Sequence, residues 1–140
     1  MLQQTKVKTV IPYFEKFTKK YKNLESLARS REKSVLKLWE GLGYYRRARN
    51  LLKTSKLLVN KHNSNLPNDI KQIKTLPGIG EYTSNVLIAL IYNKPTLAID
   101  GNVKRVVSRL LNINLNKIDF KLFKKINKKK LFNTKRNSDL

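Results

Sequence analysis

The chain has 140 residues, which is enough for one domain with a substantial hydrophobic core. It contains no cysteine, which excludes disulfides and cysteine-bound metals within the chain, and its one histidine, His62, cannot form a metal site alone. No apolar run approaches the roughly 18 residues that a membrane-spanning helix needs, and the N-terminus lacks the apolar stretch of a signal peptide.

The net charge of +22 is the most distinctive property of the composition. Residues 1–111 contain 22 basic and 7 acidic residues, giving +15, and residues 112–140 contain 9 basic and 2 acidic residues, giving +7. The body of the chain is therefore basic by itself, which favours binding to a polyanion such as nucleic acid. The alternative is a lysine-rich surface encoded by an AT-rich genome, since lysine and asparagine are both abundant.

The first third of the chain predicts three helices. Apolar residues at helical spacing predict a helix over residues 3–21 with one buried face, and Pro12 should kink it or start a new helix. Asn23 is the expected N-cap of a short helix that carries Leu27, and Ser30 the expected N-cap of a helix that reaches Trp39. Glycines at 41 and 43 end that helix.

The remaining elements are also predicted to be helical. A long helix runs from Tyr45 to His62, and Asn68 caps a short helix after it. The expected buried face of the long helix consists of Ala48, Leu51, Leu52, Leu58 and Val59. An apolar helix follows over residues 83–91, and Asp100 or Asn102 caps a last strong helix. No strand alternation persists, so we expect an all-α fold, a compact array of short helices.

The composition changes near the end of this last helix. We expect a folded domain over residues 1–111 and a basic tail over residues 112–140 that is partly disordered, although a short helix around residues 115–126 fits its apolar residues.

A glycine-containing turn, residues 76–80, separates two of the predicted helices. Pro77 ends the preceding helix, and Gly78 and Gly80 permit a positive φ and close approach of another molecule to the backbone. Backbone N–H groups at the start of the next helix then form an anion site, and the charge of the chain indicates a nucleic-acid phosphate.

Among the carboxylates, Asp100 is the strongest candidate for a catalytic residue. An aspartate before a helix is usually an N-cap. A rigidly held carboxylate in this place could also stabilise positive charge that develops on a sugar, a role that in glycosidic hydrolysis is paired with a second, protonated carboxyl group. Glu40 and Glu81 also lie near glycine turns, and nothing in the sequence distinguishes them from surface groups.

Two further segments suit contacts with bases. Residues 41–49 combine Tyr44 and Tyr45 with three arginines, including Arg46, which suits aromatic wedging between bases and phosphate binding; core packing of one tyrosine is the alternative. Gln3 and Gln4 have amides suited to base edges, a weak signal alone.

Several of these segments, in chain order, resemble a known family. The turn at 76–80 followed by Asp100 is similar to the helix-hairpin-helix DNA glycosylase superfamily. More closely, the chain resembles adenine DNA glycosylases of the MutY type over residues 1 to about 111. The segments that carry this resemblance are residues 1–5, 11–14, 38–45, 49–51 and 100–106.

The resemblance implies excision of adenine mispaired with 8-oxoguanine or guanine in double-stranded DNA, with the base flipped out of the duplex. Asp100 matches the catalytic aspartate, and Tyr82 stands where the related endonuclease III family has its Schiff-base lysine, which favours a glycosylase without lyase activity. The residues that it assigns to DNA contacts are Gln3, Gln4, Tyr44, Arg46, Gly78, Ile79, Gly80, Asn102 and Lys104. It also implies a monomer in the bacterial cytoplasm, associated with the nucleoid through DNA, and a monovalent cation on the hairpin carbonyls.

The chain also departs from the family pattern. The family's general-acid glutamate would lie two residues before Met1, and the family's four-cysteine iron–sulfur cluster has no ligands here. We therefore expect a fragment that releases little adenine as it stands, and no cofactor besides that cation. A non-catalytic helix-hairpin-helix module is one alternative, and an endonuclease III-like lyase, disfavoured by Tyr82, is another.

Overall fold

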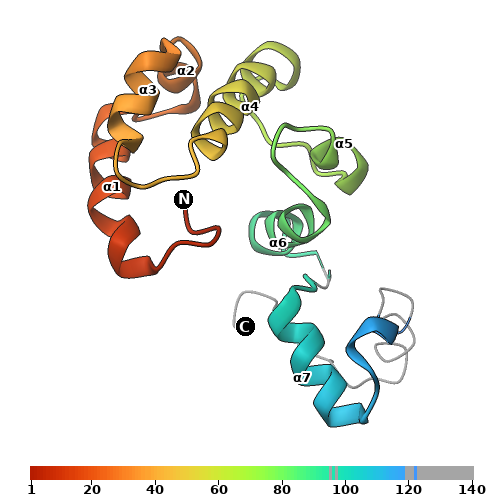
Figure 1. Cartoon of the computed structure of the whole chain (residues 1–140). Helices are drawn as coiled ribbons and strands as arrows, with labels where there is room; N and C mark the ends of the chain where they lie inside the picture. Colours follow the sequence, from red (N-terminus) through yellow and green to blue (C-terminus); the bar gives the residue numbers. More distant parts are fainter. Residues whose placement is uncertain (95, 97, 119–121, 123–140) are drawn as a thin grey trace. The chain divides into compact units, whose positions relative to one another are not determined.

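The computed structural model describes residues 1–94, 96, 98–118 and 122, which fall into two units with a boundary between Ile79 and Gly80 (Figure 1). The described residues contain α-helices, one short 3₁₀ helix and no strand, so the predicted all-α class is confirmed. Most of the predicted tail over residues 112–140 lies outside the described residues, and the domain boundary near residue 111 stays a prediction.

The first unit holds five helices of the described chain. They are α1 (Val7–Lys20), α2 (Leu24–Ala28), α3 (Glu32–Trp39), α4 (Arg46–His62) and α5 (Ile70–Lys74). Helix α3 packs on both α1 and α4, and α2 packs on α4. Their core centres on Trp39, which is 1% exposed and meets the ring of Phe17 edge to face at 6.2 Å. The core therefore fixes α3 and the N-terminal end of α4, the two helices that flank the turn with Gly41 and Gly43.

The structure confirms one of three sequence predictions about helix starts and revises the other two. Asn23 caps α2 as predicted, accepting from the Ser26 amide at 2.9 Å. The prediction for Ser30 was wrong, because α3 begins after Arg31 and the Ser30 hydroxyl donates to a carbonyl of α2 instead. Asn68 was also one residue early, since the Asp69 carboxylate accepts from the Gln72 amide at 3.1 Å.

The long helices differ from their predicted faces. Helix α1 runs through Pro12 without a new start. It buries one face, which includes Val10 and Phe17, but this face is narrower than predicted. The apolar residues that are exposed are Val7, Ile11 and Phe14. Leu51 on α4 is exposed, whereas Ser55 is buried and donates to the Leu52 carbonyl at 2.8 Å. A hydroxyl satisfied within its own helix can occupy the core-facing stripe that the apolar count assigned to leucine.

The second unit contains α6 (Glu81–Tyr92), α7 (Gly101–Leu111) and the 3₁₀ helix η1 (Leu115–Lys117). Its small core joins Val107 of α7 to Ile118, which are 6% and 2% exposed. Ile99 and Val103 pack against this pair. The segment that carries Asp100 is therefore anchored on both sides by apolar contacts, at Ile99 before it and Val103 after it.

Candidate functional site

The glycine turn between α5 and α6 is seated on α4. Gly78 has a φ of +79°, and a Cβ added to it would lie 2.7 Å from the Asn50 amide nitrogen. Thr54, one helical turn further along α4, donates its hydroxyl to the Pro77 carbonyl at 3.1 Å. The positive φ predicted for Gly78 is therefore present, and the molecule that approaches its backbone closely is the chain's own helix α4.

Ile79 and Gly80 complete the turn in different ways. The Ile79 amide donates to the Leu76 carbonyl at 3.2 Å, so the turn itself uses this group. Gly80 is the N-cap of α6 with a φ of −93°, so it does not use the positive φ that a glycine permits. No side chain caps α6, and a Cβ on Gly80 would meet no described atom within 4 Å. Gly80 thus presents an open helix start, as a phosphate site requires.

Two carbonyls of this turn already have partners. Leu76 accepts from Ile79, and Pro77 accepts from Thr54. A carbonyl oxygen has two lone pairs, so each can still contribute to a bound cation. The turn therefore fits a monovalent cation, because carbonyl oxygens are ligands for such ions.

Asp100 forms the start of α7. Its Oδ1 accepts a hydrogen bond of 2.8 Å from the Val103 amide, so the N-cap prediction is confirmed for Asp100 rather than for Asn102. Asn102 is exposed and accepts from the Arg105 guanidinium, while the Lys104 amide donates to the Asp100 carbonyl at 3.0 Å. The cap fixes the orientation of the carboxylate at a helix N-terminus, where a negative charge is favoured. The N-cap interpretation and a catalytic role are therefore compatible.

Tyr82 lies in the first turn of α6, in the same unit as Asp100. Its ring is 46% exposed, so the phenol is open to solvent or to a ligand. A phenol cannot form the imine that a lysine forms with a sugar aldehyde. The structure places both predicted catalytic side chains at helix starts, and neither is sealed in a core.

The N-terminal segment and the turn after α3 meet through an arginine. Gln4 has a φ of 57° and Tyr44 a φ of 50°, the left-handed region that side chains other than glycine rarely adopt. The Arg47 guanidinium donates to the carbonyls of Gln3 and Gly43. It also lies 5.2 Å from the centroid of the Tyr44 ring. Two residues assigned to DNA contacts, Gln3 and Tyr44, are thus joined by Arg47, which the sequence suggested only as one of three arginines for phosphates.

Sequence signals for this arginine were partial. The spacing from Gly43 and Tyr44 to Arg47 is one helical turn, which could have indicated the local contacts. The contacts with the N-terminal segment span more than 40 residues and have no sequence signal. Arg46, which the sequence did assign to DNA, is exposed at the first position of α4. Burial of the Met1 α-amino group, and then the nearby Arg47 charge, lower the pKa of that amine below its ordinary value.

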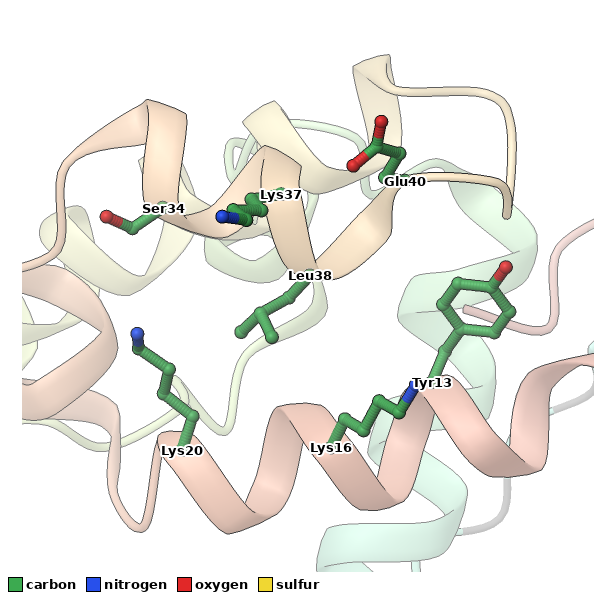
Figure 2. A pocket seen from close by; sticks show the side chains of 7 residues that line it. All are labelled: Tyr13, Lys16, Lys20, Ser34, Lys37, Leu38 and Glu40. Carbon is green, nitrogen blue, oxygen red and sulfur yellow. The ribbon is translucent and has the colours of Figure 1, made fainter.

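A separate cavity of about 490 Å³ lies between α1 and α3 (Figure 2). Figure 2 shows Lys16 and Lys20 on α1 opposite Lys37 on α3, with Glu40 at one end. Glu40 and Glu81 are both exposed, as expected for surface groups.

Within the described residues no group of His, Cys, Asp and Glu side chains could hold a metal ion. None of the helices there has the length and hydropathy to cross a membrane.

Comparison with known proteins identifies what this arrangement is similar to. A family model described as HhH-GPD superfamily base excision DNA repair protein matches residues 1–130. The adenine DNA glycosylase of Buchnera aphidicola subsp. Baizongia pistaciae is 49% identical over 116 residues, which are 83% of this chain and 33% of that protein. The adenine DNA glycosylase of Homo sapiens is 37% identical over 111 residues, 79% of this chain and 20% of that protein.

Solved structures agree with the fold. A thermostable thymine-DNA glycosylase superposes with a TM-score of 0.77 at 26% identity, covering 86% of this chain and 56% of that one. A trapped endonuclease III–DNA covalent intermediate gives 0.76 at 25% identity, covering 84% of this chain and 55% of that one. The chain spans about a third of the length of three Buchnera adenine DNA glycosylases that it matches.

Proposed function

Because the chain belongs to the HhH-GPD superfamily of base excision DNA repair proteins, we propose that it binds double-stranded DNA and serves the excision of adenine mispaired with 8-oxoguanine or guanine. Relatives named adenine DNA glycosylase are 37–49% identical to this chain over alignments that cover 79–83% of it. The proposal includes action as a monomer in the bacterial cytoplasm.

One observation carries the chemical part of the proposal: the Asp100 carboxylate is fixed by its hydrogen bond with the Val103 amide. Breaking an N-glycosidic bond leaves positive charge on the deoxyribose, between its ring oxygen and C1′. A carboxylate that is already oriented needs no reorganisation to stabilise this charge, so its interaction favours the transition state over the ground state. Asp100 has one oxygen in the cap and a second, Oδ2, to face the sugar.

The hairpin supplies the binding part. The open start of α6 at Gly80 suits a phosphate, because helix N-termini attract anions and no side chain among the described residues caps this helix. The basic charge of residues 1–111 adds a sequence-independent attraction to the duplex. A monovalent cation belongs to the same proposal: the hairpin carbonyls, including those of Leu76 and Pro77, would hold it, and it would add positive charge to the turn.

The test is equilibrium binding of the 140-residue chain to a labelled duplex that carries adenine opposite 8-oxoguanine. We expect binding that weakens steeply with salt, because each neutralised phosphate contributes about 0.9 to the slope of log affinity against log salt concentration. A single-stranded oligonucleotide of the same sequence is the control and should bind less well. Equal affinity for both forms, or affinity independent of salt, would contradict the proposal.

A further inference from the structure

Arg47 holds two segments that are far apart in the sequence. Its Nη1 donates to the Met1 carbonyl at 2.6 Å and to the Gln3 carbonyl, and its Nη2 donates to the Gly43 carbonyl at 3.3 Å. The side chain is only partly exposed. Three carbonyl acceptors from two segments show a guanidinium that is engaged with the chain's own backbone.

The same guanidinium is connected to the core. It lies 5.7 Å from the centroid of the Trp39 ring, and the Trp39 indole nitrogen donates to the Gly43 carbonyl at 3.1 Å. Its Nε is buried without a hydrogen-bond partner among the described residues, and an unsatisfied buried donor carries a free-energy cost. The protein therefore holds Arg47 in place despite a cost in folding free energy, as is common where geometry serves a function.

The carbonyls that Arg47 binds have a specific relation to the strained residues. Gln3 directly precedes Gln4, and Gly43 directly precedes Tyr44, and both Gln4 and Tyr44 are exposed with φ near +50°. The φ angle of a residue is the rotation about its N–Cα bond, which joins the peptide plane of the preceding carbonyl to the Cα atom. By fixing both of these carbonyls, Arg47 limits both φ angles and so the directions in which the Gln4 and Tyr44 side chains leave the backbone.

We propose that Arg47 is a positioning residue for DNA recognition: it holds Gln4 and Tyr44 in their left-handed conformations, prepared for insertion into the duplex. This inference rests on the proposed function, because it assigns the two side chains to DNA. It differs from the usual role of an arginine beside DNA, which is to bind a phosphate. Arg46, exposed and next to Arg47 in the chain, is suited to that usual role.

The two roles predict different responses to salt. Loss of a phosphate contact lowers the slope of log affinity against log salt concentration by about 1. Arg46→Met should show this decrease. Arg47→Met should weaken duplex binding by about tenfold while the slope stays at the wild-type value, since the coupling of residues in one contact network is typically in this range.

A double-mutant cycle then tests whether Arg47 acts through Tyr44. In a Tyr44→Ala background we expect Arg47→Met to cost less than about twofold in affinity. Arg47→Lys keeps the charge but cannot bridge three carbonyls with a planar fork, so it should behave like Arg47→Met. A lower salt slope in Arg47→Met, or wild-type duplex affinity in Arg47→Lys, would overturn the proposal in favour of a phosphate contact.

Amide hydrogen exchange supplies a readout that needs no DNA. Exchange in peptides that cover residues 1–9 and 40–46 should accelerate in Arg47→Met and not in Arg46→Met. Fluorescence of Trp39, the only tryptophan, and thermal unfolding verify that the variants fold. Unchanged exchange would refute the positioning role even if the chain binds DNA. Faster exchange in a chain that does not bind duplex would instead place the failure in the proposed function.

Discussion

Asn50 on α4 lies directly against Gly78 in the hairpin turn, so that a Cβ on Gly78 would come within 2.7 Å of the Asn50 side-chain nitrogen and 2.9 Å of its Cβ. The second of these atoms is close to the backbone and cannot move away freely. Gly78 is therefore required by the fold itself, through its positive φ and this contact. Effects of a Gly78 substitution on DNA binding cannot be separated from effects on the turn.

Gly78→Ala should destabilise the first unit. A left-handed φ costs a side chain about 1 kcal/mol or more, and the contact with Asn50 adds to this, so we expect a loss of about 1–3 kcal/mol in the free energy of unfolding. Urea denaturation measures it. Gly101→Ala is the matched control, because a Cβ there meets no described atom within 4 Å. It should be neutral or stabilising by up to about 1 kcal/mol, and an equal loss in both variants would contradict the assignment.

Gly80 permits a cleaner test of the phosphate site. Asparagine and aspartate are similar in size, and both are good N-caps, so Gly80→Asn and Gly80→Asp should both fold. Asp is expected to be at least as stable as Asn, because a negative charge is favoured at the start of α6. The duplex affinity of Gly80→Asp should nevertheless be about tenfold lower than that of Gly80→Asn, because its carboxylate would lie close to the phosphate and repel it. Fluorescence anisotropy gives the affinities, and equal values would remove Gly80 from the interface.

Lys104 is assigned to DNA contacts near Asp100. Lys104→Met should lower the slope of log affinity against log salt concentration by about 1, if its ammonium neutralises one phosphate. Lys33→Met, at an exposed position on α3 that is not assigned to DNA, is the control and should leave the slope unchanged. If the two variants have the same slope, Lys104 does not contact DNA directly.

The tyrosine at position 82 predicts a glycosylase without lyase activity. A lyase forms an imine between an amine and C1′ of the sugar, which borohydride converts to a stable covalent complex. We expect no such complex between this chain and a duplex that contains an abasic site, under conditions in which an endonuclease III enzyme is trapped. A trapped complex at a comparable yield would favour the lyase alternative.

The sequence was sufficient for the features that depend on local spacing. Helix α4 begins within one residue of its predicted start, and Asn23 and Asp100 cap their helices as expected. Caps were displaced by a residue where adjacent polar side chains compete, as Asn68 does with Asp69. Local spacing cannot decide such a competition, because both side chains can accept from the same helix start.

Features that depend on distant contacts were not predictable. The seat of Gly78 on Asn50 and the bonds from Arg47 to the N-terminal segment join residues 28 and more than 40 positions apart. The outward-facing apolar residues of α1, such as Phe14, also follow from tertiary packing, because a helix with two apolar stripes does not show which one its neighbours cover. The roles assigned to the site residues remain predictions for the experiments above.

The most direct measurement compares two duplexes that differ in charge at the sugar opposite 8-oxoguanine. One carries a pyrrolidine nucleotide, protonated at the position of C1′, and the other a neutral tetrahydrofuran. Asp100 should give the wild-type chain a preference for the cationic sugar of about tenfold or more, as a group that stabilises a positively charged transition state does. Asp100→Asn keeps the cap and therefore the fold, but should abolish the preference. A preference that persists in Asp100→Asn would contradict the central claim that this carboxylate faces the developing charge.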